Sequence, residues 1–302
     1  MVSLTRRNAL RTGAAAALAG LAGCSGGIGG SASASTTVYG DWTPEREGTG
    51  AESGGESMWA MEPADLAEGR YALGDRYDLM AAFLEPPVPT IEFGELDSVY
   101  YTGGWTTSLY GVEAGFEQSE MVTAYQEELD AETVNSTYSD YELYRVDATL
   151  HSYLVGVAEG RIAIAANGDR DRAALESLVD AREDGERRVS NDGPLSSIQS
   201  AIGQEPYTRI SIGDEVGTQV GETTPTAVAR GFSVSDSEEE LVSITAGFVL
   251  PETVTDPEAA VEARVNGDAS VGVLDFGDAE VSTEAGVVVA TEERPVGDAI
   301  SL

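Results

Sequence analysis

The sequence predicts an α+β fold in which mostly antiparallel sheets carry helices on one face. Short runs rich in β-branched and aromatic residues are joined by tight turns, which is typical of antiparallel hairpins. Between them lie stretches with apolar residues at helical spacing, several of which begin at a capping residue or Pro and end at Gly. The order strand, strand, helix, strand, strand occurs over 97–158 and again over 226–292, which suggests a ββαββ duplication.

In the first part of the folded chain, each expected element has a local signal. Glu159-Gly160 predicts a tight hairpin, because Gly tolerates the left-handed backbone of a two-residue turn. Gly185 and Gly203 each end an apolar stripe, as glycines at helix C-termini do. Helices are expected over 116–129, 171–184 and 194–202. Strands are expected over 99–101, 109–112, 141–146, 153–158 and 161–166.

The last third repeats a simpler pattern. Asp256-Pro257 predicts a helix start, since Asp caps free backbone N–H groups and Pro suits the first helical position, and Gly267 predicts its end. Strands are expected over 208–212, 227–234, 241–250, 271–274, 278–283 and 286–290. We therefore expect a first α+β domain or half over 38–205 and a second over 206–302.

Acidic side chains dominate the composition. The 302 residues include 53 Asp and Glu against 17 Arg, with no Lys and one His, and the formal net charge is −36. No basic face is expected to neutralise phosphates, so nucleic acid is excluded as a partner. Such a charge repels itself in dilute buffer, whereas in molar salt the Debye length falls to ~3 Å. The composition is therefore typical of a halophile.

The N-terminus resembles an export signal. Residues 1–23 contain no acidic side chain, and the run from Thr5 to Leu10 is similar to the twin-arginine motif. The apolar run over 13–23 is too short for a bilayer, which needs ~20 residues, and has the length of a signal-peptide core. We interpret 1–23 as a twin-arginine signal peptide. The residues assigned to its motif are Arg6, Arg7 and Leu10.

A lipid-attachment sequence closes this segment. Leu21, Ala22, Gly23 and Cys24 resemble a lipobox, in which the Cys carries the lipid after cleavage before it. Cys24 is the single cysteine, so no intrachain disulfide can form. We predict that 24–37 comprises the lipidated Cys and a flexible tether, and that the protein is anchored by lipid on the outer face of the cell membrane.

The signal, the tether and the Tyr-Gly-Asp-Trp-Thr-Pro segment at 39–44 resemble an uncharacterised family of haloarchaeal lipoproteins exported by the twin-arginine route. The resemblance covers most of the chain, but its tight motifs are those of the signal. No activity is attached to this family, so the resemblance carries over no catalytic residue.

Catalytic side chains are scarce. His151 is the sole histidine, no Gly-x-Ser-x-Gly sequence occurs, and without Lys neither a Schiff base nor a Walker-type phosphate site is available. Carboxylates are so numerous that chance pairs are unavoidable, and none of the acidic candidates has a spacing that selects it for glycoside hydrolysis. These candidates are Glu92, Glu95, Asp147, Asp275 and Asp278. We expect no cofactor and no enzyme activity.

Two polar sites carry weaker signals. Asp236, Glu238, Glu239 and Glu240 crowd one hairpin turn and offer the oxygen ligands that Ca²⁺ or Mg²⁺ prefers. A solvated turn is the preferred explanation, so no metal site is predicted. Asn135 begins an Asn-Ser-Thr sequon in an expected loop and is a candidate for N-glycosylation.

Aromatic residues gather before the first expected helix. Tyr100, Tyr101, Trp105 and Tyr110 lie close together in the chain, with Trp59 upstream. Aromatics at this density line a groove for a sugar or apolar ligand in some proteins and pack the faces of sheets in more of them.

The expected export to the cell surface and the scarcity of catalytic side chains predict a non-enzymatic binding or interaction module. The alternatives are a solute- or glycan-binding lipoprotein of a transporter and, less favoured, a carboxylate-based hydrolase. The expected partners are the membrane, through the lipid on Cys24, and either an envelope protein or a small solute. A pocket with two carboxylates would favour the hydrolase, and a broad exposed apolar patch the interaction module.

Overall fold

A computed structural model describes residues 41–44, 55–84, 86–104, 107–147, 152–166, 171–183, 193–203, 205–267 and 270–300. These residues belong to one compact unit, Thr36–Leu302. The twin-arginine motif, the lipobox with Cys24, and His151 lie outside the described residues. Within the described part of the chain, no helix is both long and apolar enough to cross a membrane.

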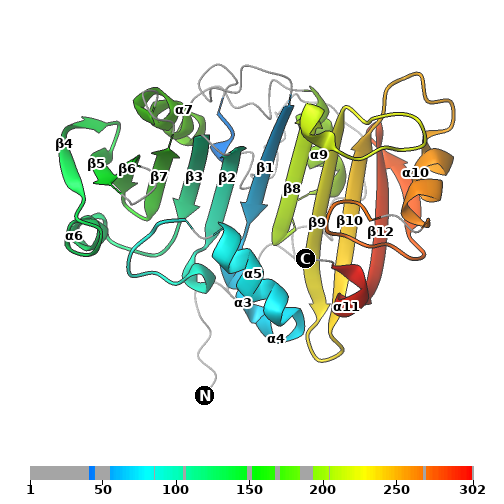
Figure 1. Cartoon of the computed structure of the whole chain (residues 1–302), viewed down its shortest axis with the longest axis horizontal. Helices are drawn as coiled ribbons and strands as arrows, with labels where there is room; N and C mark the ends of the chain where they lie inside the picture. Colours follow the sequence, from blue (N-terminus) through cyan, green and yellow to red (C-terminus); the bar gives the residue numbers. More distant parts are fainter. Residues whose placement is uncertain are drawn as a thin grey trace, which may run out of the picture. The chain divides into compact units, whose positions relative to one another are not determined.

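Twelve strands form one sheet in which each neighbouring pair is antiparallel (Figure 1). From edge to edge the order is β11-β12-β10-β9-β8-β1-β2-β3-β7-β6-β5-β4. The strands are β1 (Gly55–Met61), β2 (Ser98–Gly104), β3 (Thr107–Glu113), β4 (Glu132–Tyr138), β5 (Tyr141–Asp147), β6 (Ser152–Ala158), β7 (Arg161–Ala166), β8 (Tyr207–Gly213), β9 (Ala227–Asp236), β10 (Leu241–Val249), β11 (Glu280–Glu284) and β12 (Val287–Pro295). The predicted antiparallel α+β character is confirmed.

Both faces of the sheet are buried. In β7, Ile162 and Ile164 pack into one core cluster, on what we call face A, and Ala163 and Ala165 pack into another, on face B. Face A carries α3 (Pro63–Glu68), α4 (Arg70–Leu73), α5 (Asp75–Leu84), α6 (Gln118–Glu128), α10 (Pro257–Val265) and α11 (Val296–Ala299). Face B carries α7 (Asp171–Glu183) and α9 (Gly193–Ile202).

The expectation of helices on one face is therefore wrong. The predicted helical stripes are confirmed, since Leu175 and Leu178 of α7, and Leu195 and Ile198 of α9, are fully buried. A stripe, however, shows only that a helix packs against something. The missing information was in the strands, because a run such as 161–166 is apolar at every position after the first and so needs cover on both sides.

The two expected halves meet in the middle of this sheet. Strands β1 to β7 come from 38–205 and β8 to β12 from 206–302, and the two sets join where β1 pairs with β8. On each side a hairpin is followed by a helix on face A, an edge strand and a return to the hairpin. Counting the edge strand, the path back to the hairpin takes four strands, β4 to β7, in the first set and two, β11 and β12, in the second.

One short N-terminal segment, 41–44, packs on face B. The Trp42 side chain is fully buried in the face B cluster. It occupies the space that a side chain at Gly111 of β3 would need: a Cβ built there would lie 2.2 Å from Cδ2 of the Trp42 ring. Arg182 of α7 lies over the same ring, with its Cζ 5.9 Å from the ring centroid. Because Gly111 has no side chain, the sheet leaves a space that the Trp42 ring fills, and we call this space the Trp42 socket.

Candidate functional site

Four half-buried side chains form a row across face A at the centre of the sheet. Pairing places Arg209 of β8 opposite Trp59 of β1, Trp59 opposite Tyr101 of β2, and Tyr101 opposite Tyr110 of β3. All four are partly accessible, whereas most of face A is fully covered. We call these residues the central row.

The members of the central row are in direct contact. The Cζ of Arg209 lies 4.6 Å from the centroid of the Trp59 ring, within the range of a cation–π interaction. The ring centroids of Trp59 and Tyr101 are 5.0 Å apart, and those of Tyr101 and Tyr110 are 4.8 Å apart. The rings are tilted by 50° and 46° rather than stacked, so the row is a stepped aromatic strip that begins at a cation.

A pocket of about 530 Å³ lies at the Tyr110 end of the central row. We call it the proline pocket, because the segment Pro86–Pro89 forms one wall. Burial raises the pKa of both Tyr110 and Tyr153, so their phenols stay protonated at ordinary pH. The remaining lining residues are Ser108, Glu128, Leu129, Ile164 and Ala166. The lining combines apolar side chains with the hydroxyl groups of Ser108, Tyr110 and Tyr153 and the carboxylate of Glu128.

A buried polar cluster lies at the other end of the row. Arg230 of β9 is directly opposite Arg209 and is only 4% exposed. Its Nη2 donates to Oγ1 of Thr218 at 2.8 Å and to the carbonyl of Val216 at 3.3 Å, and its Nη1 donates to Oγ of Ser211 at 3.4 Å. We call this the arginine cluster; its members are Ser57, Arg209, Ser211, Thr218 and Arg230.

The arginine cluster has two positive charges and no negative one. Among the described residues, no carboxylate forms an ion pair with Arg209 or Arg230, and the Nε of each has no acceptor. Burial, and then the neighbouring Arg209, lower the pKa of Arg230 to about 10. Arg230 is therefore still charged at neutral pH, although its partners are all neutral oxygens.

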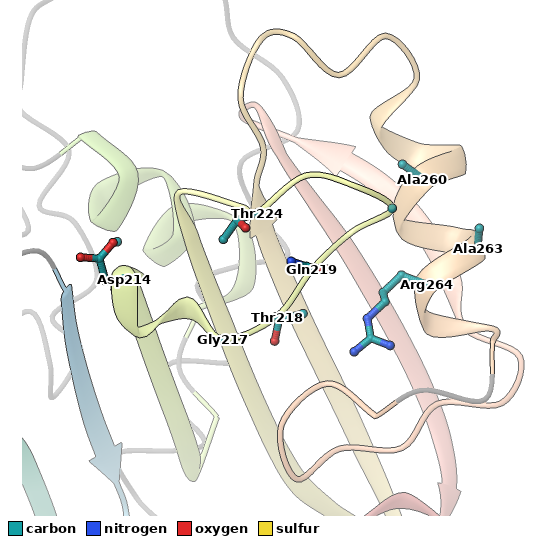
Figure 2. Close-up of a pocket in the computed structure, with 10 residues that line it drawn as sticks. Asp214, Gly217, Thr218, Gln219, Thr224, Ala260, Ala263 and Arg264 are labelled. Atoms are coloured by element: carbon teal, nitrogen blue, oxygen red, sulfur yellow. The ribbon is translucent and has the colours of Figure 1, made fainter.

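A larger opening, about 1000 Å³, lies between α10 and the loop that follows β8. We call it the loop pocket. Figure 2 shows Arg264 extending from α10 toward the loop that carries Thr218, with Asp214 at the far end. Arg264 donates to the carbonyl of Ser270 at 2.7 Å, and its Nε has no acceptor. Thr218 both lines this pocket and accepts from Arg230, so it joins the pocket to the arginine cluster.

The acidic turn is explained by local geometry. Asp236, Glu238, Glu239 and Glu240 are exposed at the β9–β10 turn, and Oδ1 of Asp236 accepts from the backbone N–H groups of Glu238 and Glu239. That pattern is a turn stabilised by an Asp side chain. In the part of the chain that the structure describes, no group of three or more His, Cys, Asp or Glu is placed to hold a metal ion.

The sequon lies in a strand and not in the expected loop. Asn135 is in β4, between Thr133 and Thr137, where the register with β5 shifts; its side chain lies outside the described residues. Use of Asn135 as a glycosylation site stays a prediction. The acidic pair Glu92 and Glu95 forms a capping box around a 3₁₀ turn, Phe93–Glu95.

The aromatic group divides between the two faces. Tyr101, Tyr110 and Trp59 meet in the central row, whereas Tyr100 is fully buried on face B and Trp105 lies outside the described residues. Sequence reasoning missed the arginines, because a single Arg in an apolar strand forms no motif. The available signal was the scarcity of basic residues, which makes an Arg inside a run such as 207–213 unusual in this chain.

Comparison with known proteins assigns no family. No family model matches the chain, and no curated protein matches it significantly. Two solved structures, crystal forms I and IV of a protein called TP0453, have TM-scores of 0.45 and 0.43 at 8% and 9% identity. The matches cover 85% and 84% of this chain and 96% and 95% of those chains. Similarity at this level indicates neither a family nor a function.

Proposed function

We propose that this chain is a non-enzymatic, lipid-anchored binding protein on the outer surface of a halophile, and that it binds carbohydrate on the central row. The observation that carries the proposal is the strip of Trp59, Tyr101 and Tyr110, which remains accessible in the middle of a covered face. Aromatic rings with a nearby polar handle give a sugar both an apolar surface and hydrogen bonds. The proline pocket extends this strip at the Tyr110 end.

Two alternatives receive less support from the same surface. A module for protein interaction is expected to show a broad apolar patch, but the large hydrophobic side chains exposed in the described structure are Tyr71 and Leu79. Hydrolysis of a glycoside generally uses two facing carboxylates. The carboxylates that line the two pockets are Glu128 in the proline pocket and Asp214 in the loop pocket. Delivery of a glycan to a transporter stays compatible with the proposal.

Location and solvent are proposed from the sequence. The twin-arginine run, the lipobox at Cys24 and the tether support a lipid anchor with the binding domain held away from the membrane. The net charge of −36 supports residence in concentrated salt.

We also propose that the sheet arose by duplication. Strands β1, β2 and β3 correspond to β8, β9 and β10, since each set runs outward from the antiparallel β1–β8 pair. Helices α6 and α10 then occupy equivalent places on face A, each before an edge strand. On this hypothesis the first copy gained one extra hairpin in its return path.

The test measures the affinity of the full-length protein for oligosaccharides in multi-molar NaCl. Quenching of Trp fluorescence and calorimetry both report this affinity. We expect Trp59→Ala to weaken binding about tenfold, which corresponds to ~1.4 kcal/mol. Tyr71→Ala is the matched control, because Tyr71 is an exposed aromatic residue on α4 and not a member of the central row. The proposal fails if no oligosaccharide binds, or if Tyr71→Ala weakens binding as much as Trp59→Ala does.

A further inference from the structure

The arginine cluster lacks a partner of the kind that buried charges normally have. Arg209 and Arg230 are directly opposite each other on adjacent strands, and like charges in that arrangement destabilise a sheet. Buried charges are usually paired with an opposite charge. Six other arginines of the described chain contact a carboxylate within 4.0 Å: Arg70, Arg145, Arg161, Arg172, Arg182 and Arg294. Arg76 and Arg264 also have no carboxylate within 4.0 Å among the described residues, and each donates to a backbone carbonyl. Arg209 and Arg230 differ from them because they lie directly opposite each other and Arg230 is buried.

The neutral oxygens around Arg230 hold it in place without cancelling its charge. Thr218, Val216 and Ser211 together accept three hydrogen bonds from its Nη1 and Nη2. Ser211 also lies 3.1 Å from Ser57, whose Oγ is 3.5 Å from Nη2 of Arg209. The cluster therefore holds Arg230 by three neutral acceptors and contains no negative group.

Position connects this site to the central row. Arg209 belongs to both: one side of its guanidinium lies over the Trp59 ring, and its strand neighbour is Arg230. We propose that the carbohydrate on the central row is acidic, and that its carboxylate binds at Arg209 with Arg230 behind it. This inference rests on the proposed function for the sugar itself. A guanidinium fork matches a carboxylate with two parallel hydrogen bonds, so the acid group would also fix the direction of the sugar along the aromatic strip.

Concentrated salt makes this arrangement testable. At molar salt the Debye length is ~3 Å, so general attraction between an acidic ligand and surface arginines disappears. A carboxylate in contact with a partly buried guanidinium such as that of Arg209 is screened much less. A preference for the acid form that persists in multi-molar NaCl is therefore the mark of a contact and not of long-range attraction.

The experiment compares oligogalacturonate with its methyl ester, in which a neutral ester replaces each carboxylate, on the full-length protein in multi-molar NaCl. We expect the acid to bind at least tenfold more tightly than the ester. Arg209→Gln should abolish this preference, and Arg209→Lys, which keeps the charge but not the fork, should retain part of it. Arg70→Gln is the control: it removes the same charge from an exposed ion pair with Asp78.

Each outcome decides between the two proposals. Equal binding of acid and ester overturns the acidic ligand and leaves the carbohydrate site standing. Binding of neither overturns both proposals. A folding measurement separates a binding role from a structural one: we expect Arg209→Gln to leave the urea midpoint unchanged or to raise it, because it removes one of two neighbouring like charges. A lowered midpoint together with an unchanged acid preference would make Arg209 a structural residue and overturn the inference.

Discussion

The Trp42 socket gives the sharpest test of the packing. Replacing Gly111 by Ala would place a Cβ 2.2 Å from Cδ2 and 2.4 Å from Cε3 of the Trp42 ring, well inside contact distance. The neighbour is a rigid ring in a fully buried site, so it cannot move aside without leaving the socket. Overpacking costs ~1–3 kcal/mol, and expulsion of Trp42 sets an upper limit of ~3–5 kcal/mol, the usual cost of Trp→Ala in a core. We expect Gly111→Ala to destabilise the domain within these limits.

The double variant shows whether the ring is the cause. Without the ring, the added methyl group finds space, and Ala also restricts the unfolded chain, which stabilises by ~0.4–1 kcal/mol. Gly111→Ala should therefore be neutral or stabilising in a Trp42→Ala background. Urea unfolding at fixed high salt, followed by circular dichroism, measures all four free energies of unfolding. If the losses of the two single variants simply add, to within ~0.5 kcal/mol, the socket has no energetic role and the reasoning is refuted.

Three further predictions concern the solvent, the anchor and one half-buried acid. Dialysis from multi-molar NaCl to about 0.1 M should expand or unfold the domain as repulsion returns, and a flat curve of stability against salt would contradict the halophilic interpretation. Cys24→Ser should release the protein to the medium or leave it uncleaved, as fractionation of cells would show, whereas unchanged mature membrane protein would disprove the lipobox. Burial raises the pKa of Glu205 above its unfolded value, so its ionisation lowers stability as pH rises through the folded-state pKa. Glu205→Gln should therefore raise the urea midpoint at pH 7. The gain should be smaller near pH ~4, because Glu205 of the unfolded chain begins to take up protons there. An equal gain at both pH values would argue against a raised pKa of Glu205 in the folded state.

Local signals predicted much of the fold. The expected helix start at Asp256 is confirmed, with its side chain accepting from the N–H of Ala259, and the stripe continues through the buried Val261 and Val265. The hairpin at Glu159-Gly160 is also confirmed, with Gly160 at a φ of 65°. These features depend on residues within one or two turns of each other, so sequence alone can show them.

Long-range features were not predictable in the same way. Nothing near β1 indicates that it pairs with β8, about 150 residues later. The helices α3, α4 and α5 are short, and α5 carries only a weak apolar stripe. The central row and the arginine cluster need five strands side by side, β9, β8, β1, β2 and β3, so their members could be listed as aromatic or basic residues but not assembled. The aromatic density near Tyr101 was the part of the site that the sequence could show.

The two edge strands of the described sheet, β11 and β4, bear on whether copies of the chain associate in the concentrated salt that we propose as their solvent. An edge strand exposes unpaired backbone groups on which another chain can pair. Edge strand β11 is only five residues long and begins and ends with Glu280 and Glu284, a charge that would deter a second copy in dilute buffer. In molar salt that deterrent acts over only ~3 Å. Backbone geometry still acts in molar salt. A second chain finds no long, regular strand to pair with, because β11 is short and the register of β4 shifts between Thr133 and Thr137. Straightening β4 should therefore cause aggregation most readily in multi-molar salt.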